Sequence, residues 1–349
     1  MKFTKVGIIG IGAATANIHL PALRKLRDVQ LVGGYDRASS ANHRGIATYS
    51  SIDELLSTGQ PDILLIATPP SSHAELVKHG LRAGCHIFCE KPLANNLEEA
   101  DDIIATARSV NRHVVVNSEF PSMTVHAEAK KGMTHGGFGK LLFVEMRQSF
   151  VVTDATEHGW RGLDQQRTFK EFGTHVIDLA KFFFGEQPTY IRARMPKPDA
   201  SDGPDYLNII ELGFSGDRVA HIILNRLARG QHRYLDITLN GEHSTIETSI
   251  GGRLQFTSGL RTSTRRPFVE LDVAMGGRSR RYDGDRFVTL GKSPLDLFAQ
   301  GTAQVFREFI DAINRGTHPP QSIEDARNTL ELLYSAYDCA KDGSVRRFD

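Results

Sequence analysis

The start of the chain combines a short, continuously apolar run with a glycine turn, and this pair restricts the fold more than any other feature. Residues 6–9 read Val-Gly-Ile-Ile, and the turn Gly10-Ile11-Gly12-Ala13-Ala14-Thr15 follows directly. An apolar run without polar alternation is typical of a strand buried on both faces of a parallel sheet. Gly10 permits the tight turn, and Gly12 lets the backbone approach a pyrophosphate at the N-terminus of the next helix.

Four further strands follow, and helical patterns separate them. They are predicted over residues 30–35, 62–67, 86–89 and 114–117. Strands that alternate with helices at this spacing form right-handed βαβ crossovers and therefore a doubly wound parallel sheet. We expect a Rossmann-type α/β domain over residues 1–121, with its ligand beyond the carboxyl ends of the strands.

Three residues near these strands bear on the cofactor. Asp36 follows the second strand. In NAD-binding domains of this kind, a carboxylate roughly 20 residues beyond the glycine turn accepts a hydrogen bond from the adenosine ribose, and Asp36 lies close to that position. The adjacent Arg37 suits a 2′-phosphate, so NADP stays as the alternative to NAD. Thr15 occupies the position at which a dinucleotide-binding turn usually carries a third glycine. Either the helix and the strand stand farther apart at Thr15, or its hydroxyl turns toward a phosphate. A helix-start turn without nucleotide is the other interpretation, and the helix should begin late, near Asn17, because Pro21 falls inside it.

Glu90-Lys91-Pro92 ends the fourth predicted strand and carries the chemistry. Hydride transfer from an alcohol needs a base, and an exposed lysine with a pKa of about 10.4 is a poor one at neutral pH. Burial and the positive charge of an oxidised nicotinamide lower the pKa of a neighbouring amine. We therefore interpret Lys91 as the acid and base rather than as a surface lysine. Pro92 removes a donor, and its peptide bond is a candidate for the cis form.

Composition narrows the range of partners. Lys and Arg number 42 against 41 Asp and Glu, so no global charge favours nucleic acid or an anionic membrane. Two arginine-rich stretches, residues 261–266 and 278–286, are interpreted as solvated loops or strand ends. No apolar segment is long enough for a membrane span or a signal peptide, which makes the cytoplasm the expected location. The three cysteines and 14 histidines show no metal-ligand spacing, so no metal is expected.

Two motifs together resemble the glucose–fructose oxidoreductase and inositol dehydrogenase (GFO/IDH/MocA) family. They are Ala67-Thr68-Pro69-Pro70 with His73, and the run over residues 83–94 that contains Glu90-Lys91-Pro92. The segment His19-Leu20-Pro21-Ala22-Leu23 agrees with them. The resemblance implies an N-terminal Rossmann domain and a C-terminal α+β domain with a large, mostly antiparallel open sheet. It also implies homodimers or homotetramers formed through that sheet, and oxidation or reduction of sugars, polyols and related ring alcohols.

The second part of the chain supports this fold from its own pattern. Strands are predicted over residues 141–150, 190–195, 206–214, 219–227, 234–239 and 244–250, with turns at 215–217 and 240–242. Two helices follow within residues 297–340. We expect an α+β substrate-binding and oligomerisation domain over residues 122–349. The helices of 297–340 should pack on it, and additional packing back on the first domain is left open.

Residues of both domains enter the predicted site. The resemblance implies cofactor contacts at Gly10, Gly12, Ala13, Ala14, Thr15, Asp36, Arg37, Thr68, Pro69, His73, Glu90 and Lys91. The family's other half-site is an Asp-x-x-x-His helix with a further aspartate, and Glu171, His175 and Asp178 stand in its place. Residues four apart share a helix face, so Glu171 and His175 can point into one cleft. There His175 either carries a proton or hydrogen-bonds the reacting oxygen, and Asp178 orients its ring. Glu171 replaces the usual aspartate, and the predicted substrate contacts are Glu119, Trp160, Arg161, Arg167 and Asp178.

These features predict an oxidoreductase that uses NAD, with NADP as the alternative. It transfers a hydride between nicotinamide and a sugar, cyclitol or related hydroxyl or keto compound. Lys91 is the predicted acid and base, and His175 is its partner. Two alternatives on the same fold stay open. One is an enzyme that retains NAD and uses transient oxidation to cleave a glycosidic bond, and the other is a non-catalytic regulator that senses the cofactor.

Overall fold

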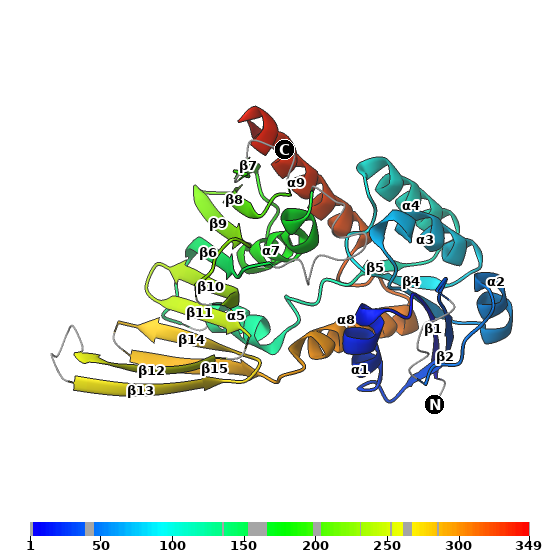
Figure 1. Cartoon of the computed structure of the whole chain (residues 1–349), viewed down its shortest axis with the longest axis horizontal. Helices are drawn as coiled ribbons and strands as arrows, with labels where there is room; N and C mark the ends of the chain where they lie inside the picture. Colours follow the sequence, from blue (N-terminus) through cyan, green and yellow to red (C-terminus); the bar gives the residue numbers. More distant parts are fainter. Residues whose placement is uncertain are drawn as a thin grey trace. The chain divides into compact units, whose positions relative to one another are not determined.

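The computed structural model divides the chain into two compact units (Figure 1). It describes residues 3–38, 45–134, 136–152, 166–197, 204–230, 232–251, 253–260, 267–284 and 286–348. The first unit comprises Met1–Glu119 and Phe298–Glu331, and the second comprises Phe120–Leu297 and Leu332–Asp349. The division expected from the sequence assigns everything beyond residue 121 to the second domain, whereas the structure groups residues 298–331 with the first.

A five-stranded parallel sheet forms the centre of the first unit. Its order is β2-β1-β3-β4-β5, and the strands are β1 (Thr4–Ile9), β2 (Val29–Tyr35), β3 (Ile63–Ile66), β4 (His86–Cys89) and β5 (Val114–Val116). The chain passes from β1 to β2 on one side and returns to β3 on the other. The carboxyl ends of β1 and β3 therefore form a switch point, where such sheets bind ligands. The predicted Rossmann fold is confirmed.

Helices connect these strands. The longer ones are α3 (His73–Arg82) and α4 (Leu97–Ser109), and the short ones are α2 (Ile52–Glu54), η2 (Leu55–Gly59) and η3 (Pro70–Ser72). The side chain of Asn96 accepts from the N–H of Glu99 at 2.8 Å and thereby caps α4. Among the described helices of the chain, none combines the length and apolar character that crossing a bilayer requires.

The helix after the glycine turn begins earlier than predicted. Helical geometry starts at Ala13, not near Asn17, and continues through η1 (Thr15–His19), a π-helical segment, into α1 (Leu20–Leu23). Pro21 therefore lies inside a continuous helix, where its missing N–H and its ring disturb the hydrogen-bond ladder. The wider π turn before it is one of the adjustments with which a continuous helix accommodates a proline ring.

Helix α8 (Leu297–Arg315) completes the core of the first unit. Its residues Phe306 and Phe309 are buried, and the ring of Phe306 stacks on Phe88 of β4 with 3.8 Å between ring centroids. Full burial of a phenylalanine side chain stabilises a fold by about 1.5–3 kcal/mol. The apolar stripe of this helix therefore packs on the Rossmann sheet, although α8 follows the second unit in sequence. Helix α9 (Ile323–Asp342) begins in the first unit and ends in the second.

A nine-stranded sheet forms the centre of the second unit. Its order is β15-β14-β11-β10-β6-β9-β8-β7-β16. The pair β6 and β9 is parallel, and every other neighbouring pair is antiparallel. The predicted, mostly antiparallel open sheet is thereby confirmed. The strands are β6 (Leu141–Ser149), β7 (Tyr190–Arg194), β8 (Leu207–Phe214), β9 (Arg218–Asn225), β10 (Arg233–Gly241), β11 (Thr245–Ile250), β14 (Gly277–Asp283), β15 (Arg286–Ser293) and β16 (Val345–Arg347).

Two helices, α5 (Thr124–Thr134) and α7 (Thr168–Phe184), pack on the apolar side of this sheet. Gly132 of α5 lies so close to β15 that a Cβ would stand 2.6 Å from the side chain of Leu290. Phe184 of α7 stacks on Phe214 of β8 with 3.9 Å between ring centroids. Buried and half-buried residues alternate along β10, as expected for a sheet with one covered face.

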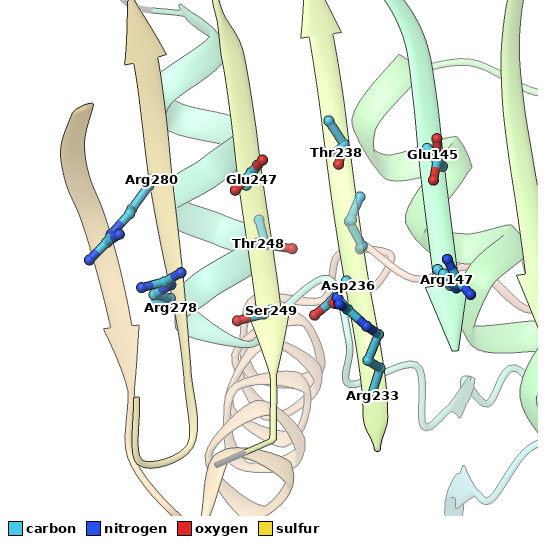
Figure 2. A pocket seen from close by; sticks show the side chains of 11 residues that line it. Glu145, Arg147, Arg233, Asp236, Thr238, Glu247, Thr248, Ser249, Arg278 and Arg280 are labelled. Carbon is cyan, nitrogen blue, oxygen red and sulfur yellow. The ribbon is translucent and has the colours of Figure 1, made fainter. Parts of the chain in front are cut away.

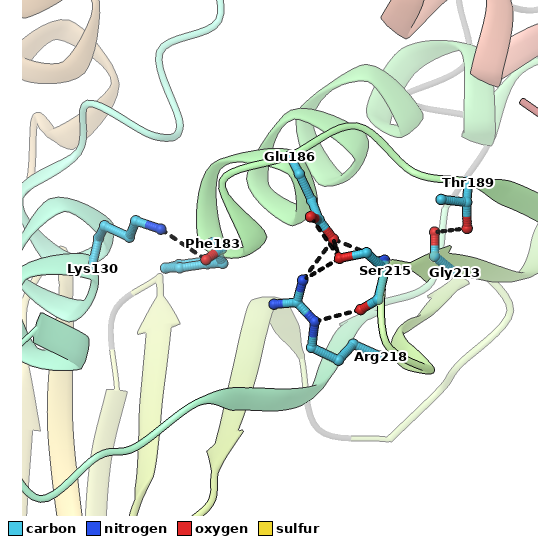
Figure 3. A network of polar contacts seen from close by, with 7 residues as sticks. All are labelled: Lys130, Phe183, Glu186, Thr189, Gly213, Ser215 and Arg218. Atoms are coloured by element: carbon cyan, nitrogen blue, oxygen red, sulfur yellow. Dashed lines mark hydrogen bonds and ion pairs between the residues drawn. The ribbon is translucent and has the colours of Figure 1, made fainter. Parts of the chain in front are cut away.

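The carboxyl end of α7 is joined to the hairpin turn between β8 and β9 (Figure 3). Glu186 accepts from the N–H of Ser215 at 2.9 Å and pairs with Arg218 at 2.7 Å. Lys130 of α5 donates to the carbonyl oxygen of Phe183 at 2.8 Å. These contacts hold α5, α7 and the sheet together, so the side chains that α7 carries have a rigid support.

A two-stranded ribbon, β12 (Arg253–Leu260) and β13 (Pro267–Ala274), pairs only with itself among the described residues. The sequence analysis did not predict it. Alternate residues of a strand share a face, and along β13 Val269, Leu271 and Val273 are 70%, 65% and 51% exposed. Of the two arginine-rich stretches interpreted as loops or strand ends, residues 261–266 lie outside the described residues and 278–286 fall largely within β14 and β15.

Candidate active site

The glycine turn of the first unit fits a pyrophosphate. Gly10 has a φ of +93°, and a Cβ there would lie 2.6 Å from the carbonyl oxygen of Ala67, so only glycine is tolerated. A Cβ built on Gly12 meets no atom within 4 Å, which leaves the surface of the turn open. Ala13 and Ala14 begin the helix, and the first N–H groups of a helix have no partner within it. An anion at this turn would meet both these donors and the helix dipole.

Thr15 and Asp36 stabilise this turn from two sides. The buried hydroxyl of Thr15 donates to the carbonyl oxygen of Gly10 at 2.6 Å, so it closes the turn instead of facing a phosphate. Asp36, directly after β2, accepts from the N–H groups of Ile11 at 2.6 Å and Ala38 at 2.8 Å. Each carboxylate oxygen has two acceptor sites, so Asp36 retains capacity for a ribose hydroxyl. Arg37 beside it is exposed.

His73 links the loop after β3 to the loop after β4. Its ring is fully buried, with Nδ1 2.7 Å from the carbonyl oxygen of Pro92 and Nε2 2.9 Å from that of Thr68. Burial lowers the pKa of His73, and the two carbonyl contacts oppose that effect. The ring of His73, a predicted cofactor contact, supports the loops of Thr68 and Pro69 from inside.

Glu90 and Lys91 follow β4 directly. Lys91 is half-buried, and its peptide bond to Pro92 is cis, as predicted. The carboxylate of Glu90 lies 2.9 Å from Nε2 of His19 and accepts from Nδ2 of Asn117, also at 2.9 Å. Burial alone would raise the pKa of Glu90, but its contact with His19, the charge of Lys91 and the hydrogen bond from Asn117 hold that pKa at about 2. Glu90 is therefore ionised at neutral pH.

Asn117 and Glu119 follow β5. Asn117 is buried and lies within hydrogen-bond distance of the hydroxyl of Thr302 on α8, at 3.3 Å. Glu119, a predicted substrate contact, is 4% exposed. His19 and Asn117 were not among the predicted site residues. Their positions in the sequence could have indicated a role in the site. His19 begins the segment of residues 19–23 that resembles the family, and Asn117 follows the apolar run of β5.

Helix α7 carries the other predicted half-site, in the second unit. The carboxylate of Glu171 pairs with Arg226, with 2.7 Å between Oε2 and Nη1. His175 is nearly buried, and its ring lies against Phe120 with 4.2 Å between ring centroids. Asp178, predicted to orient the ring of His175, lies 3.6 Å from Nζ of Lys181. The structure thus gives the acidic residues of this helix cationic neighbours on the second unit.

Asp205 holds the start of α7, and the sequence analysis did not identify it. Its buried carboxylate accepts from the N–H groups of Arg167, Thr168 and Phe169 at 2.5, 2.8 and 3.1 Å. The side chain of Arg167, the N-cap residue, makes no capping hydrogen bond, and the acceptor is supplied by a residue far along the chain. The predicted substrate contact Arg167 is 3% exposed. Two more, Trp160 and Arg161, lie outside the described residues.

A polar cavity of about 300 Å³ lies on the outer face of the nine-stranded sheet (Figure 2). Side chains of β6, β10, β11 and β14 line it, and none of the predicted catalytic residues is among them. Its charged lining consists of Glu145, Arg147, Arg233, Asp236, Glu247, Arg278 and Arg280. Over the described ranges of the chain, no group of three or more His, Cys, Asp or Glu side chains is arranged to hold a metal ion.

Matches to known proteins extend over both units. Residues 4–118 match a family model described as an oxidoreductase family with an NAD-binding Rossmann fold, and residues 126–247 match the GFO/IDH/MocA C-terminal domain. The D-apiose dehydrogenase of Paraburkholderia graminis is 25% identical over 358 residues, covering 98% of this chain and 89% of that protein. The inositol 2-dehydrogenase of Rhizobium meliloti is 22% identical, covering 95% of each. An aldose-aldose oxidoreductase from Caulobacter crescentus shares the fold, with a TM-score of 0.80 at 18% identity over both whole chains.

Proposed function

Because this chain belongs to the GFO/IDH/MocA family of NAD-binding oxidoreductases, we propose that Lys91 is the acid and base of a sugar or cyclitol dehydrogenase. Relatives along the whole chain carry the names D-apiose dehydrogenase and inositol 2-dehydrogenase, a sugar and a cyclitol enzyme. The observation that carries the proposal is the position of Lys91 directly after β4, at the carboxyl edge of the sheet. Ligands of such sheets bind at that edge.

The chain offers contacts for each part of the cofactor. The open turn at Gly12 and the N–H groups of Ala13 and Ala14 would hold the pyrophosphate. Asp36 would accept from the ribose, and its charge would oppose a 2′-phosphate, which favours NAD. NADP is the second candidate, because the exposed Arg37 would attract that phosphate. Bound NAD supplies the acceptor for the hydride of an alcohol carbon.

Lys91 is a better candidate for the base than its neighbour Glu90. A carboxylate with a pKa of about 2 is too weak a base to remove a hydroxyl proton at neutral pH. In oxidation, the amine of Lys91 takes that proton while the C–H hydrogen leaves with its electron pair. In reduction, the protonated amine returns it to the new alkoxide.

His175 is the proposed hydrogen-bond partner of the reacting oxygen. Its ring is held between aromatic neighbours, with centroid distances of 4.2 Å to Phe120 and 5.5 Å to Phe172. A fixed ring presents its nitrogen in one direction, which positioned acid and base groups require. Glu171 stands one turn earlier on the same helix and would keep its charge, because it pairs with Arg226.

Lys91→Ala tests the proposal. The absorbance of reduced nicotinamide is followed with aldoses, ketoses, cyclitols and their keto forms, with NAD and with NADP. Removal of a general acid or base lowers rates by about 10²–10⁴-fold, so we expect a loss of this size in kcat with unchanged NAD affinity. Lys78→Ala is the matched control, because Lys78 belongs to the same unit and pairs with Asp102 at 3.3 Å, on helix α4.

Each outcome of this experiment assigns a function. Equal activity of Lys91→Ala and the wild type would place the chemistry on another residue. Tight binding of NAD without turnover of any compound in the panel would favour redox-assisted glycoside cleavage or a cofactor-sensing regulator. Loss of activity in Lys78→Ala as well would show that the assay reports general damage to the first unit.

We further propose that the second unit joins copies of this chain through the outer face of its sheet and the ribbon β12–β13. The charged cavity on that face contains four arginines and three carboxylates, so two copies related by a two-fold axis can pair opposite charges. Exposed apolar rows such as that of β13 mark interaction surfaces, and an isolated ribbon is only marginally stable in water. A monomeric mass by light scattering would contradict this proposal.

A further inference from the structure

Two buried histidines stand on either side of the Glu90-Lys91-Pro92 motif, and the proposed chemistry gives neither of them a role. His19 lies in η1, shortly after the glycine turn, and His73 begins α3 beyond β3. Both residues are 0% exposed. Burial of an imidazole ring costs free energy unless the ring has polar partners. Each of these histidines therefore indicates a specific role beside the Glu90-Lys91-Pro92 motif.

His19 holds the residue that precedes Lys91. Its Nε2 lies 2.9 Å from Oε1 of Glu90, an ion-pair distance, although the ring is not aligned for a full hydrogen bond. Asn117 donates to the same oxygen at 2.9 Å, and the N–H of Lys91 donates to the other oxygen at 3.3 Å. The ring of His19 also meets Phe88 of β4 edge-on, with 6.2 Å between centroids. The carboxylate of Glu90 is thus fixed against the first helix and β5.

His73 holds the residue that follows Lys91. As a neutral imidazole the ring donates to one of the carbonyl oxygens of Pro92 and Thr68, and as an imidazolium it donates to both. The hydroxyl of Ser72 donates to the hydroxyl of Thr68 at 2.8 Å and stabilises the same loop. The loop after β3 and the loop after β4 therefore fix each other through His73.

We propose that His19 and His73 are positioning residues, which hold Glu90 and Pro92 and thereby set the direction of the Lys91 amine. The proposal rests on the assignment of Lys91 as acid and base. A proton acceptor must come within about 2.6–3.2 Å of the hydroxyl it serves. Without His19, the carboxylate of Glu90 would lose a partner and turn toward the amine of Lys91. An amine paired with a carboxylate gives up its proton less readily and points away from the substrate.

Four variants separate positioning from general packing. His19→Leu and His73→Leu remove the ring but keep an apolar side chain of similar size, and His19→Gln restores a donor that reaches Glu90. His86→Leu is the control, because His86 begins the same strand, β4, at its opposite end; it is partly buried, whereas His19 and His73 are fully buried. Three quantities are measured for each variant. They are kcat, the Kd of NADH by its fluorescence, and the rate at which an amine reagent labels Lys91, followed by mass spectrometry.

We expect kcat to fall by about 10- to 100-fold in both leucine variants, since a misplacement of about 1 Å can cost about 10²-fold in rate. The Kd of NADH should change far less than kcat, because the glycine turn and Asp36 are untouched. Labelling of Lys91 should slow in His19→Leu. His19→Gln and His86→Leu should stay close to the wild type in all three quantities.

Wild-type kcat and labelling in both leucine variants would overturn the proposal, and so would equal losses in His86→Leu. If His19→Leu does not fold, His19→Asn takes its place, since its shorter amide cannot reach Glu90. Retained activity in Lys91→Ala would instead refute the proposed function. The labelling rate would still decide whether the histidines hold Lys91, because labelling requires no turnover.

Discussion

Asp205 holds the N-terminus of the helix that carries Glu171 and His175, and its removal should weaken the second unit. Besides the three N–H groups at the start of α7, its carboxylate accepts from Nδ2 of Asn208 at 3.0 Å and from the hydroxyl of Tyr337 at 2.9 Å. Asp205 is 2% exposed, so its partners are shielded from bulk solvent. Asp205→Ala would deprive a helix start and two side chains of this acceptor.

The expected loss follows from these contacts. Removing a helix cap costs about 0.5–2 kcal/mol, and each buried donor left unsatisfied costs about 1–3 kcal/mol. Such costs are not additive, and single substitutions rarely exceed about 4–5 kcal/mol. We therefore expect Asp205→Ala to lower the free energy of unfolding by about 4 kcal/mol, or Tm by about 10 °C for a unit of this size. Asp205→Asn keeps one acceptor oxygen and should lose about 2 kcal/mol.

Urea unfolding, followed by near-ultraviolet circular dichroism, measures these losses, and calorimetry gives Tm. Asp338→Ala is the matched control, because Asp338 is exposed on α9 next to Tyr337 and should change stability by less than about 0.5 kcal/mol. Tyr337→Phe removes one of the donors. Combined with Asp205→Ala, it should cost less than the sum of the two single losses, because both variants break the same contact.

A loss below about 1 kcal/mol in Asp205→Ala would refute this reasoning, because it is less than a single unsatisfied buried donor should cost. An additive double variant would show that Tyr337 and Asp205 do not depend on each other. A loss of similar size in Asp338→Ala would show that α9 tolerates no substitution in this region.

Two further predictions concern pH and assembly. The pKa of Glu90 is about 2 in the fold and 4.5 without it, so its stabilisation is present above about pH 5 and is lost as pH falls toward 2. The stabilisation amounts to about 3 kcal/mol. Glu90→Gln should therefore make the free energy of unfolding depend less steeply on pH below about pH 5. An unchanged pH dependence would contradict the lowered pKa of Glu90. Leu271→Asp places a charge in the apolar row of β13 and should reduce the oligomeric mass measured by light scattering. Phe3→Asp, which changes an exposed residue of the first unit, is the control, and an unaltered mass for Leu271→Asp would place the interface elsewhere.

The first unit was predictable where the signal is local. The apolar run of β1, the glycine turn and the strand that ends just before Glu90 were all predicted, and the structure confirms the parallel sheet to which these strands belong. Burial on both faces makes such strands apolar throughout, and the turn needs glycine at Gly10, so both signals are contained in a few consecutive residues. The prediction that the first helix begins late was wrong, because the position of Pro21 does not reveal that a π turn precedes it.

The details of the site were less accessible. The sequence suggested that Thr15 either spreads helix and strand or faces a phosphate, but its hydroxyl closes on Gly10. His73 was expected at the cofactor, and the structure adds that its ring joins the loops after β3 and β4. The sequence shows that Thr15 and His73 stand near the predicted site. The direction of each side chain depends on which backbone groups lie near it after folding.

By itself, the sequence determined where the strands of the first unit lie along the chain, the place of the glycine turn and the position of Lys91 at a strand end. These follow from periodicity and turn chemistry, which act between neighbouring residues. Only the tertiary structure decided that α8 packs on the first unit, that His19 meets Glu90, and that Asp205 caps a helix 38 residues away in the chain. Such contacts join residues that no local pattern relates, because they depend on how buried polar groups find partners once the core has formed.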